Sequence, residues 1–154
     1  MKIEFSKKEL LFDIMNKSHG EVSVITDAEA RYKAEAGTEK TDEIERDLIT
    51  STSVLYASIG RFLCGNLTPY ADNGAGLPDT LVYEFTFSER RLDGKAQPLA
   101  DAIHAFLVDS TLGLFYNSVS ASDLAVKRSN MAQADLQLVE RLVYTKKQPY
   151  MTRN

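Results

Sequence analysis

The stretch that decides the fold is residues 122–146, SDLAVKRSNMAQADLQLVERLVYTK. Its apolar residues recur every three or four positions, which is the spacing of an amphipathic helix. We expect Ser120 or Ser122 to cap the start of this helix. At the other end, Lys146 and Lys147 are placed where they favour the negative end of the helix dipole. The sequence therefore predicts one long helix that reaches about residue 146.

The apolar residues of this helix form two adjacent stripes. One stripe consists of Leu124, Met131, Ala134, Leu138 and Leu142, and the other of Ala125, Ala132, Leu136, Val139 and Val143. A helix that is apolar over so much of its circumference is either central to its own bundle or shared with a neighbouring subunit. Both interpretations stay open.

Two helices are expected in the first 40 residues. Ser6 and Glu9 form a capping-box pattern that opens the first helix, and Ser18-His19-Gly20 is expected to interrupt it. Residues 28–36 favour a second helix by propensity, and Gly37 lies where a left-handed C-terminal cap is common. This region therefore predicts a pair of short helices.

The middle of the chain predicts two more helices. Asp42 and Glu45 form another capping-box pattern, and the apolar periodicity that follows continues to a plausible stop at Gly65. Pro98 suits the first turn of a further helix, which is expected to end near Asn117. The helical patterns therefore number four to five along the chain.

Residues 81–88 carry the alternating pattern of a β-strand with one aromatic face. The repeating side chains of that face are Leu81, Tyr83, Phe85 and Phe87. A single strand cannot satisfy its own N–H and C=O groups, so a partner strand is required. Its candidates are residues 90–92, a piece of the preceding loop at 65–80, or the edge of a neighbouring subunit.

These patterns together predict a mainly α fold, a small bundle of about four to five helices with a minor β-strand or hairpin insertion. We expect a single helical domain over residues 1–154. Within it, residues 1–40 form an N-terminal helical extension and residues 41–147 form the core. The core carries a loop and strand insertion at 65–95, and residues 148–154 are expected to be a flexible tail.

The composition narrows the function classes. With 154 residues, 44% of them hydrophobic, the chain can bury one core but is short for two domains. A net charge of −4 gives no basic footprint for phosphate backbones, so direct nucleic-acid binding is disfavoured. The only cysteine, Cys64, fits a reducing cytoplasmic setting. Residues 1–9 mix acidic residues with lysines and no long apolar run follows, so neither a signal peptide nor membrane insertion is expected.

The sequence contains no recognisable catalytic centre. Residues 73–76 hold two glycines but lack the lysine and the preceding strand of a nucleotide-binding loop, so they predict a turn. His19 and His104 lie in no metal-binding motif and beside no nucleophile. Asp101 shares a helix face with His104, but such pairs are commonplace on helix surfaces. Catalysis by this pair is therefore disfavoured.

The other reactive residue types favour structural roles. Cys64 adjoins an expected helix C-terminus, where the dipole disfavours a thiolate, so a buried structural cysteine is expected. The grouped acids are expected on solvated faces; they are Glu21, Asp27, Glu43, Glu45 and Asp47. We therefore predict no enzyme activity, no cofactor and no metal. A small helical enzyme, the weakest alternative, needs a pocket that combines His104, Asp101 and Tyr116.

Residues 101–116 form an apolar and aromatic helical pattern, and after a short turn the amphipathic residues 125–142 follow. This order of helices resembles the head-to-tail connector, or adaptor, proteins of tailed bacteriophages and prophages. The basic, proline-containing residues 144–149 resemble the ends of such proteins. Residues 42–67 resemble the family's helix before a loop. The N-terminal 40 residues and the aromatic strand are additions to the minimal pattern.

The resemblance implies a virion structural protein that assembles into a ring joining portal to tail. Its partners are then copies of itself and the portal and tail proteins, with DNA only as passing cargo and no membrane contact. The implied location is the virion, or the host bacterial cytoplasm during assembly. Basic residues are candidates to face the channel or the portal, although solvated helix faces explain them equally well; they are Lys127, Arg128, Arg141, Lys146 and Lys147.

A non-enzymatic bacterial regulatory or adaptor protein is the alternative, binding one partner through its exposed strand. It predicts a stable monomer, whereas the connector predicts self-association. The candidate interface residues are Tyr83, Phe85, Phe87, Leu136, Val139, Val143, Lys146 and Lys147.

Overall fold

The computed structural model describes residues 1–64 and 76–144. Its helices are α1 (Lys7–Val22), α2 (Ala28–Ala34), α3 (Thr41–Ile59), α4 (Ala96–Ser118) and α5 (Ser122–Tyr144), and its strands are β1 (Lys2–Ser6) and β2 (Thr80–Glu84). Short 3₁₀ turns lie at Thr38–Lys40, Gly60–Phe62 and Glu89–Leu92. The prediction of a mainly α bundle of about five helices with a minor β element is confirmed.

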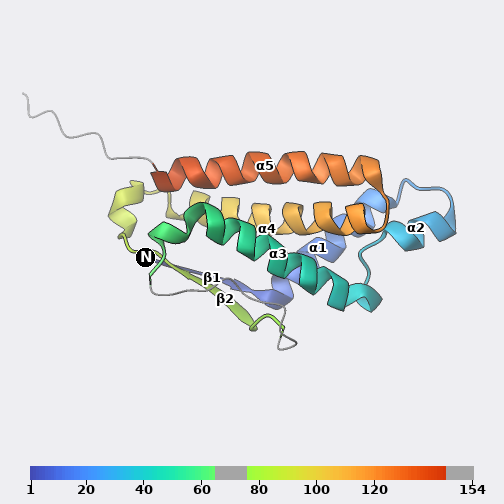
Figure 1. The fold of residues 1–154 in the computed structure, drawn as a ribbon, viewed down its shortest axis with the longest axis horizontal. Coiled ribbons are helices and arrows are strands. Elements are labelled where there is room, and N and C mark those ends of the chain that lie inside the picture. The colour runs from blue at the N-terminus through green and yellow to red at the C-terminus, as the bar shows by residue number, and fades with distance from the viewer. Residues whose placement is uncertain (65–75, 145–154) are drawn as a thin grey trace, which may run out of the picture.

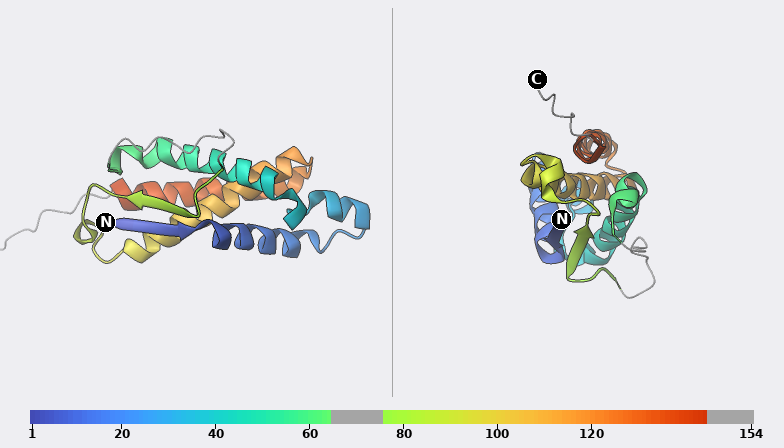
Figure 2. Two further views of the ribbon diagram at one scale, coloured as in Figure 1. Left: turned by 90° about the horizontal axis from the view of Figure 1, so that it is seen from below. Right: turned by 90° about the vertical axis from the view of Figure 1, so that its left-hand side faces the viewer.

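Helix α4 is the centre of the described fold. Twelve of its 23 residues are buried, because it is apolar around most of its circumference. Seen end-on, α5 lies on one side of α4, α1 and α3 flank it, and the strands lie opposite α5 (Figure 2). Helices α4 and α5 run antiparallel along most of their length (Figure 1). Helices α1, α3 and α5 therefore reach the core through contact with α4.

The partner of β2 is the N-terminal strand β1. The two strands are antiparallel, with Ile3 opposite Tyr83 and Phe5 opposite Leu81. The sequence placed the partner at 90–92, in the preceding loop or on another subunit, and this prediction was wrong. Only Ile3 and Phe5 signal alternation in β1, and a capped helix follows at once. Residues predicted as an extension thus contribute β1 to the sheet and α1 to the packing against α4.

Helix α1 begins where the sequence predicted but does not break. The Ser6 hydroxyl accepts a hydrogen bond from the Glu9 N–H at 3.4 Å, as a helix N-cap does. The predicted interruption at Ser18-His19-Gly20 is wrong, because the helix continues to Val22. Ser18 is buried, and its hydroxyl accepts a hydrogen bond from the Ala36 N–H at 2.8 Å. Ser18, which was predicted to interrupt the helix, therefore binds the segment that follows α2.

Gly37 does not cap α2. The helix ends at Ala34, followed by an extended Glu35, and Gly37 itself has a φ of −88°. The left-handed cap predicted from the glycine is therefore wrong. Instead, the Lys40 ammonium donates to the carbonyl oxygens of Tyr32, Lys33 and Glu35 at 2.6 to 3.1 Å. A lysine side chain satisfies the carbonyl groups that end the helix.

Helix α3 lacks the predicted capping box. It begins at Thr41, so Asp42 lies inside its first turn and not before it. The Glu45 carboxylate accepts a hydrogen bond from the Leu77 N–H at 2.9 Å and lies 3.5 Å from the Lys7 ammonium. Glu45 is therefore used by a contact distant in sequence. The predicted stop, Gly65, lies outside the described residues.

Helix α5 packs closely on α4 at Gly113. A Cβ atom at this glycine would lie 3.0 Å from Ser129 Oγ and 3.3 Å from its backbone nitrogen, so a larger residue would push α5 away. Neither serine predicted as a cap lies before the helix as a cap must, because Ser122 is its first residue and Ser120 adopts a φ of 61° in the turn. The predicted end near residue 146 lies outside the described part of the chain.

Candidate interaction surface

Helices α3 and α5 both pack on α4 but meet each other at one end. There, the Tyr144 hydroxyl donates to the Ser58 carbonyl oxygen at 3.1 Å, and the Ser58 hydroxyl donates to the Glu140 carboxylate at 2.7 Å. Toward its own N-terminus, α3 runs away from α5 (Figure 1). The two helices therefore form the walls of a wedge whose floor is α4.

A groove of about 490 Å³ occupies this wedge. We call it the α3–α5 groove. Its lining is Val54 from α3, Phe106, Ser110, Gly113, Leu114 and Asn117 from α4, and Ala125, Val126, Ser129, Asn130, Ala132, Gln133 and Leu136 from α5. Charged residues make up 26% of the chain, yet none lines the groove within the described residues. Absence of charge is a property of the central region of protein interfaces.

The walls of the groove expose large apolar side chains. Val54 is 43% exposed and Val126 is 62% exposed, although each belongs to a helix whose other face is buried. The second apolar surface of α5 is the outer patch, which consists of Met131, Ala134 and Leu138. Met131 and Leu138 are each 40% exposed. Of the two stripes predicted in α5, one is therefore buried against α4 or lines the groove, and the other remains largely accessible.

The predicted aromatic interface is mostly internal. Tyr83 is 4% exposed and Phe85 is 2% exposed, because the aromatic face of β2 packs into the core. Phe87 is partly buried and lies edge-on to Phe62, with the Arg91 guanidinium 4.7 Å from its ring centre. The strand that the sequence presented as exposed thus uses its aromatic side chains within the chain itself.

The predicted interface residues of α5 lie in two different environments. Val139 and Val143 are buried under the helix, whereas Leu136 is partly buried and lines the α3–α5 groove. Lys146 and Lys147 lie outside the described residues. Val54 and Val126 were not predicted as interface residues, because their positions in the sequence indicate nothing until the two helices are placed on α4. Met131 and Leu138 were recognised as apolar stripe residues but not as interface candidates.

A buried ionic network joins α5 to α1 and α4. Arg128 Nε donates to the Glu21 carboxylate at 2.7 Å, and its guanidinium also binds the Asp109 carboxylate. The side chains of Arg128, Glu21 and Asp109 are 8%, 10% and 4% exposed. Burial raises the pKa of Tyr116 to about 12, so its hydroxyl stays protonated and donates to Glu21 at 3.2 Å. Glu21 is therefore not on a solvated face, and Arg128 does not face a channel.

Asp135 adds a carboxyl group with a raised pKa to this network. Burial first, and then a hydrogen bond and the negative charge of Asp109, raise the pKa of Asp135 to about 7. Its Oδ2 atom is buried without a hydrogen-bond partner among the described residues. The only acid between Ser129 and Val139 thus turns inward, and it leaves the exposed surface of this part of α5 uncharged.

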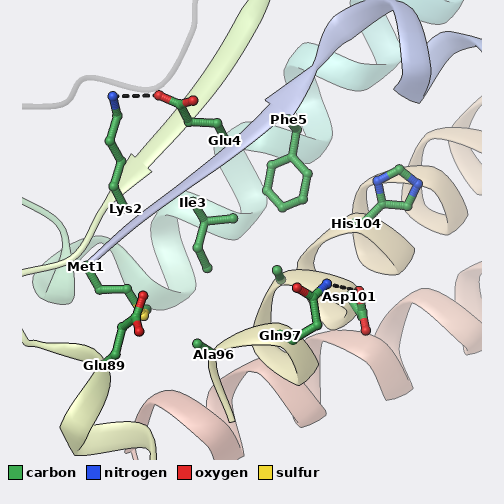
Figure 3. A pocket seen from close by; sticks show the side chains of 11 residues that line it. Met1, Lys2, Ile3, Glu4, Phe5, Glu89, Ala96, Gln97, Asp101 and His104 are labelled. Carbon is green, nitrogen blue, oxygen red and sulfur yellow. Dashed lines mark hydrogen bonds and ion pairs between the residues drawn. The ribbon is translucent and has the colours of Figure 1, made fainter. Parts of the chain in front are cut away.

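A second groove, of about 420 Å³, runs beside β1 and the start of α4 (Figure 3). Asp101 accepts a hydrogen bond from Gln97 at 2.8 Å there, and Lys2 pairs with Glu4. His104 lies at one end of the groove but bonds to Asp13 of α1 at 2.8 Å. The histidine–carboxylate pair considered from the sequence, Asp101 with His104, is not formed.

The residues of the enzyme hypothesis do not share a pocket. His104 and Tyr116 are twelve residues apart on α4, which corresponds to about 18 Å along a helix axis. Residues 1–64 and 76–144 contain no group of three or more histidine, cysteine or acidic side chains that could hold a metal. Cys64, predicted to be buried, is partly exposed, and its N–H donates to the Glu84 carbonyl oxygen at 2.7 Å.

None of the described helices combines the length and the apolar character that crossing a membrane requires. Comparisons of the chain with protein-family models, with curated proteins and with solved structures found no match. The candidate surfaces therefore have to be interpreted from their own chemistry.

Proposed function

We propose that the chain is a non-catalytic assembly component that binds other protein subunits through the α3–α5 groove. The observation that carries the proposal is the uncharged lining of this groove in a chain with 26% charged residues. The groove is formed by three helices that pack in a fixed arrangement, so a partner would not have to order it first. Such a surface suits a helix or loop whose side chains are apolar or small and polar.

The exposed apolar side chains supply a driving force for binding. Complete burial of a valine side chain stabilises by about 1.5–3 kcal/mol. With 43% of Val54 and 62% of Val126 still accessible, covering both corresponds to about 1.5–3 kcal/mol. Each valine alone corresponds to about 0.6–2 kcal/mol, so the pair together contributes about as much as one strong interface residue.

Within this class, we propose a head-to-tail connector of a tailed phage or prophage. Residues 101–142, which resemble that family, correspond to most of the antiparallel pair α4 and α5, which carries most of the groove. The partners are then further copies of the chain and the portal and tail proteins, and the location is the virion. The alternative is a regulatory protein that binds a partner through its strand. Because Tyr83 and Phe85 are buried, such binding would use the backbone edge of the strand and not its aromatic face.

The test compares binding with and without the groove. Light scattering at several concentrations, alone and with the portal protein encoded in the same genome, measures assembly of the wild-type chain. Val126→Glu places a charge in the groove and is expected to weaken assembly at least tenfold. Val24→Glu is the matched control, because Val24 is 80% exposed and lies outside the groove.

Two results contradict the proposal. The first is a wild-type chain that stays monomeric and does not bind the portal protein. The second is a Val126→Glu variant that assembles as the wild type does. Circular dichroism of both variants controls for folding, since each changes an exposed side chain.

A further inference from the structure

We infer that the α3–α5 groove receives the outer patch of a second copy of this chain, in a head-to-tail contact. The inference rests on the proposed function and adds to it the identity of the occupant and the direction of assembly. Five structural features lead to it: the positions of the two surfaces on α5, their lack of charge, an acidic pair at one end of the groove, a lysine beside the patch, and the spacing of these residues.

The two surfaces lie on different sides of one helix. Successive residues of an α-helix are about 100° apart, so Met131 lies about 160° around α5 from Gln133, which lines the groove. Leu138 lies about 140° from the same residue. A contact between patch and groove therefore uses a different surface on each copy. Such contacts are heterologous, and they repeat into rings or filaments instead of closing as twofold dimers.

The two surfaces match in chemistry. Both are uncharged, since the groove has no charged lining residue in the described chain and Asp135 of α5 turns toward Asp109. Met131 and Leu138 are seven residues apart, so they project from the same side of α5 about 10 Å apart. Methionine adapts its shape to an irregular apolar surface. The patch is therefore suited to the groove, where Val54 and Val126 are exposed.

The ends of the two surfaces carry opposite charges. Asp47 and Glu43 lie two and three turns before Val54 on the same face of α3, toward the end where the groove is open. Burial, together with the Glu43 carboxylate, raises the pKa of Asp47 to about 6. No salt bridge to either acid is formed within the described residues. Lys127 lies one turn before Met131. It pairs with Glu21 of its own chain at 3.4 Å, but it is 59% exposed, so its ammonium can also face the two acids of the next copy.

The spacing of these residues fixes the direction of the second copy. Asp47 and Val54 are seven residues apart, and so are Lys127 and Ala134. Suppose that α5 of one copy lies parallel to α3 of the next copy, with Lys127 of the first beside Asp47 of the second. Ala134 of the first copy then lies beside Val54 of the second. Because α3 and α5 of one copy both run toward the closed end of the groove, the α5 helices of successive copies are parallel.

Cysteine cross-linking tests this arrangement. In a Cys64→Ser background, a chain carrying Val54→Cys is mixed with a chain carrying Ala134→Cys and oxidised at a concentration where light scattering detects oligomers. We expect a disulfide-linked pair that contains one chain of each kind, and no linked product from either chain alone. A chain carrying both cysteines is expected to form a ladder of linked oligomers. Ala30→Cys, an exposed position on α2, replaces Ala134→Cys as the control and should yield no product with Val54→Cys.

A charge exchange tests the same contact without a cross-link. Asp47→Lys is expected to weaken self-association at least tenfold, and Lys127→Glu in the same chain to restore part of it. Circular dichroism of both variants controls for the loss of the Lys127–Glu21 pair within the chain. A linked dimer from the Ala134→Cys chain alone would show a symmetric contact and overturn the inference, as would the absence of a Val54–Ala134 product in associating protein. If the Val126→Glu variant nevertheless loses portal binding, the proposed function stands and only the head-to-tail contact fails.

Discussion

Replacement of Arg128 by alanine is expected to lower the stability of the fold by removing the cation that joins α5 to α1 and α4. The guanidinium is 8% exposed and binds two carboxylates from different helices, Glu21 of α1 and Asp109 of α4. Its removal leaves Asp109 buried without its cation and Glu21 with only the exposed Lys127 at 3.4 Å, beside a third carboxyl group on Asp135. The hydrogen bond from Tyr116 to Glu21 is too weak to compensate a full charge.

The expected loss follows from the burial of the network. Removing one partner of a buried ion pair costs about 3–5 kcal/mol, because an uncompensated charge remains in a region of low polarity. A domain of this length has an unfolding entropy of about 0.3 kcal/mol/K near 60 °C. The Arg128→Ala variant should therefore melt about 10–15 °C below the wild type.

Thermal and urea denaturation, followed by circular dichroism, measure this loss. The matched control is Lys127→Ala, which removes the other cation near the same Glu21 carboxylate. Lys127 lies 3.4 Å from Glu21 and is 59% exposed, so its removal should cost at most about 0.5 kcal/mol. If Arg128→Ala is no more destabilising than Lys127→Ala, the reasoning from burial is wrong. A triple change of Arg128→Met, Glu21→Gln and Asp109→Asn should lose less stability than Arg128→Ala alone, because no buried charge is left unpaired.

Two further predictions concern Asp135 and β1. The pKa of Asp135 is raised to about 7 in the folded chain, so its contribution to stability is present below about pH 4 and is lost as the pH rises to 7. The free energy of unfolding of Asp135→Asn should therefore exceed that of the wild type by about 1 kcal/mol at pH 8, a value reduced for partial solvent exposure. Urea titrations should show this difference shrinking toward pH 4. Phe5→Ala should cost about 3 kcal/mol in the same assay, since Phe5 is 8% exposed, whereas Glu4→Ala on the solvent side of β1 should cost less than about 0.5 kcal/mol. Equal stability of these two variants would indicate that β2 does not depend on β1.

The helices were predictable where apolar residues recur at helical spacing. The periodicities of residues 98–117 and 122–146 predicted most of α4 and all of the described α5, because such a pattern needs no knowledge of the partner. The signals that failed were the local polar ones. Ser18 looked like a break and Glu45 like a cap, yet each makes its hydrogen bond to a residue distant in sequence. Such partners cannot be inferred from spacing along the chain.

The candidate surface was only half predictable for a related reason. The accessible stripe on α5, with Met131 and Leu138, follows from helical spacing. The α3–α5 groove does not, because it exists only where α3 diverges from α5 beyond the contact of Ser58 with Glu140. The aromatic residues of β2 were wrongly predicted to be exposed, since an alternating strand has the same pattern whether its apolar face meets a partner or its own core.

The pairing of β1 with β2 also constrains how the chain is made. Ile3 pairs with Tyr83, so the ribosome must add 80 further residues after Ile3 before β1 can pair with β2. At a synthesis rate of about 5–20 residues per second, this delay is about 4–16 s. Throughout that interval Ile3 and Phe5 are apolar groups on an unpaired edge, open to association with other nascent chains. Slow translation between β1 and β2 should therefore lower the yield of native protein more than an equal pause after residue 84.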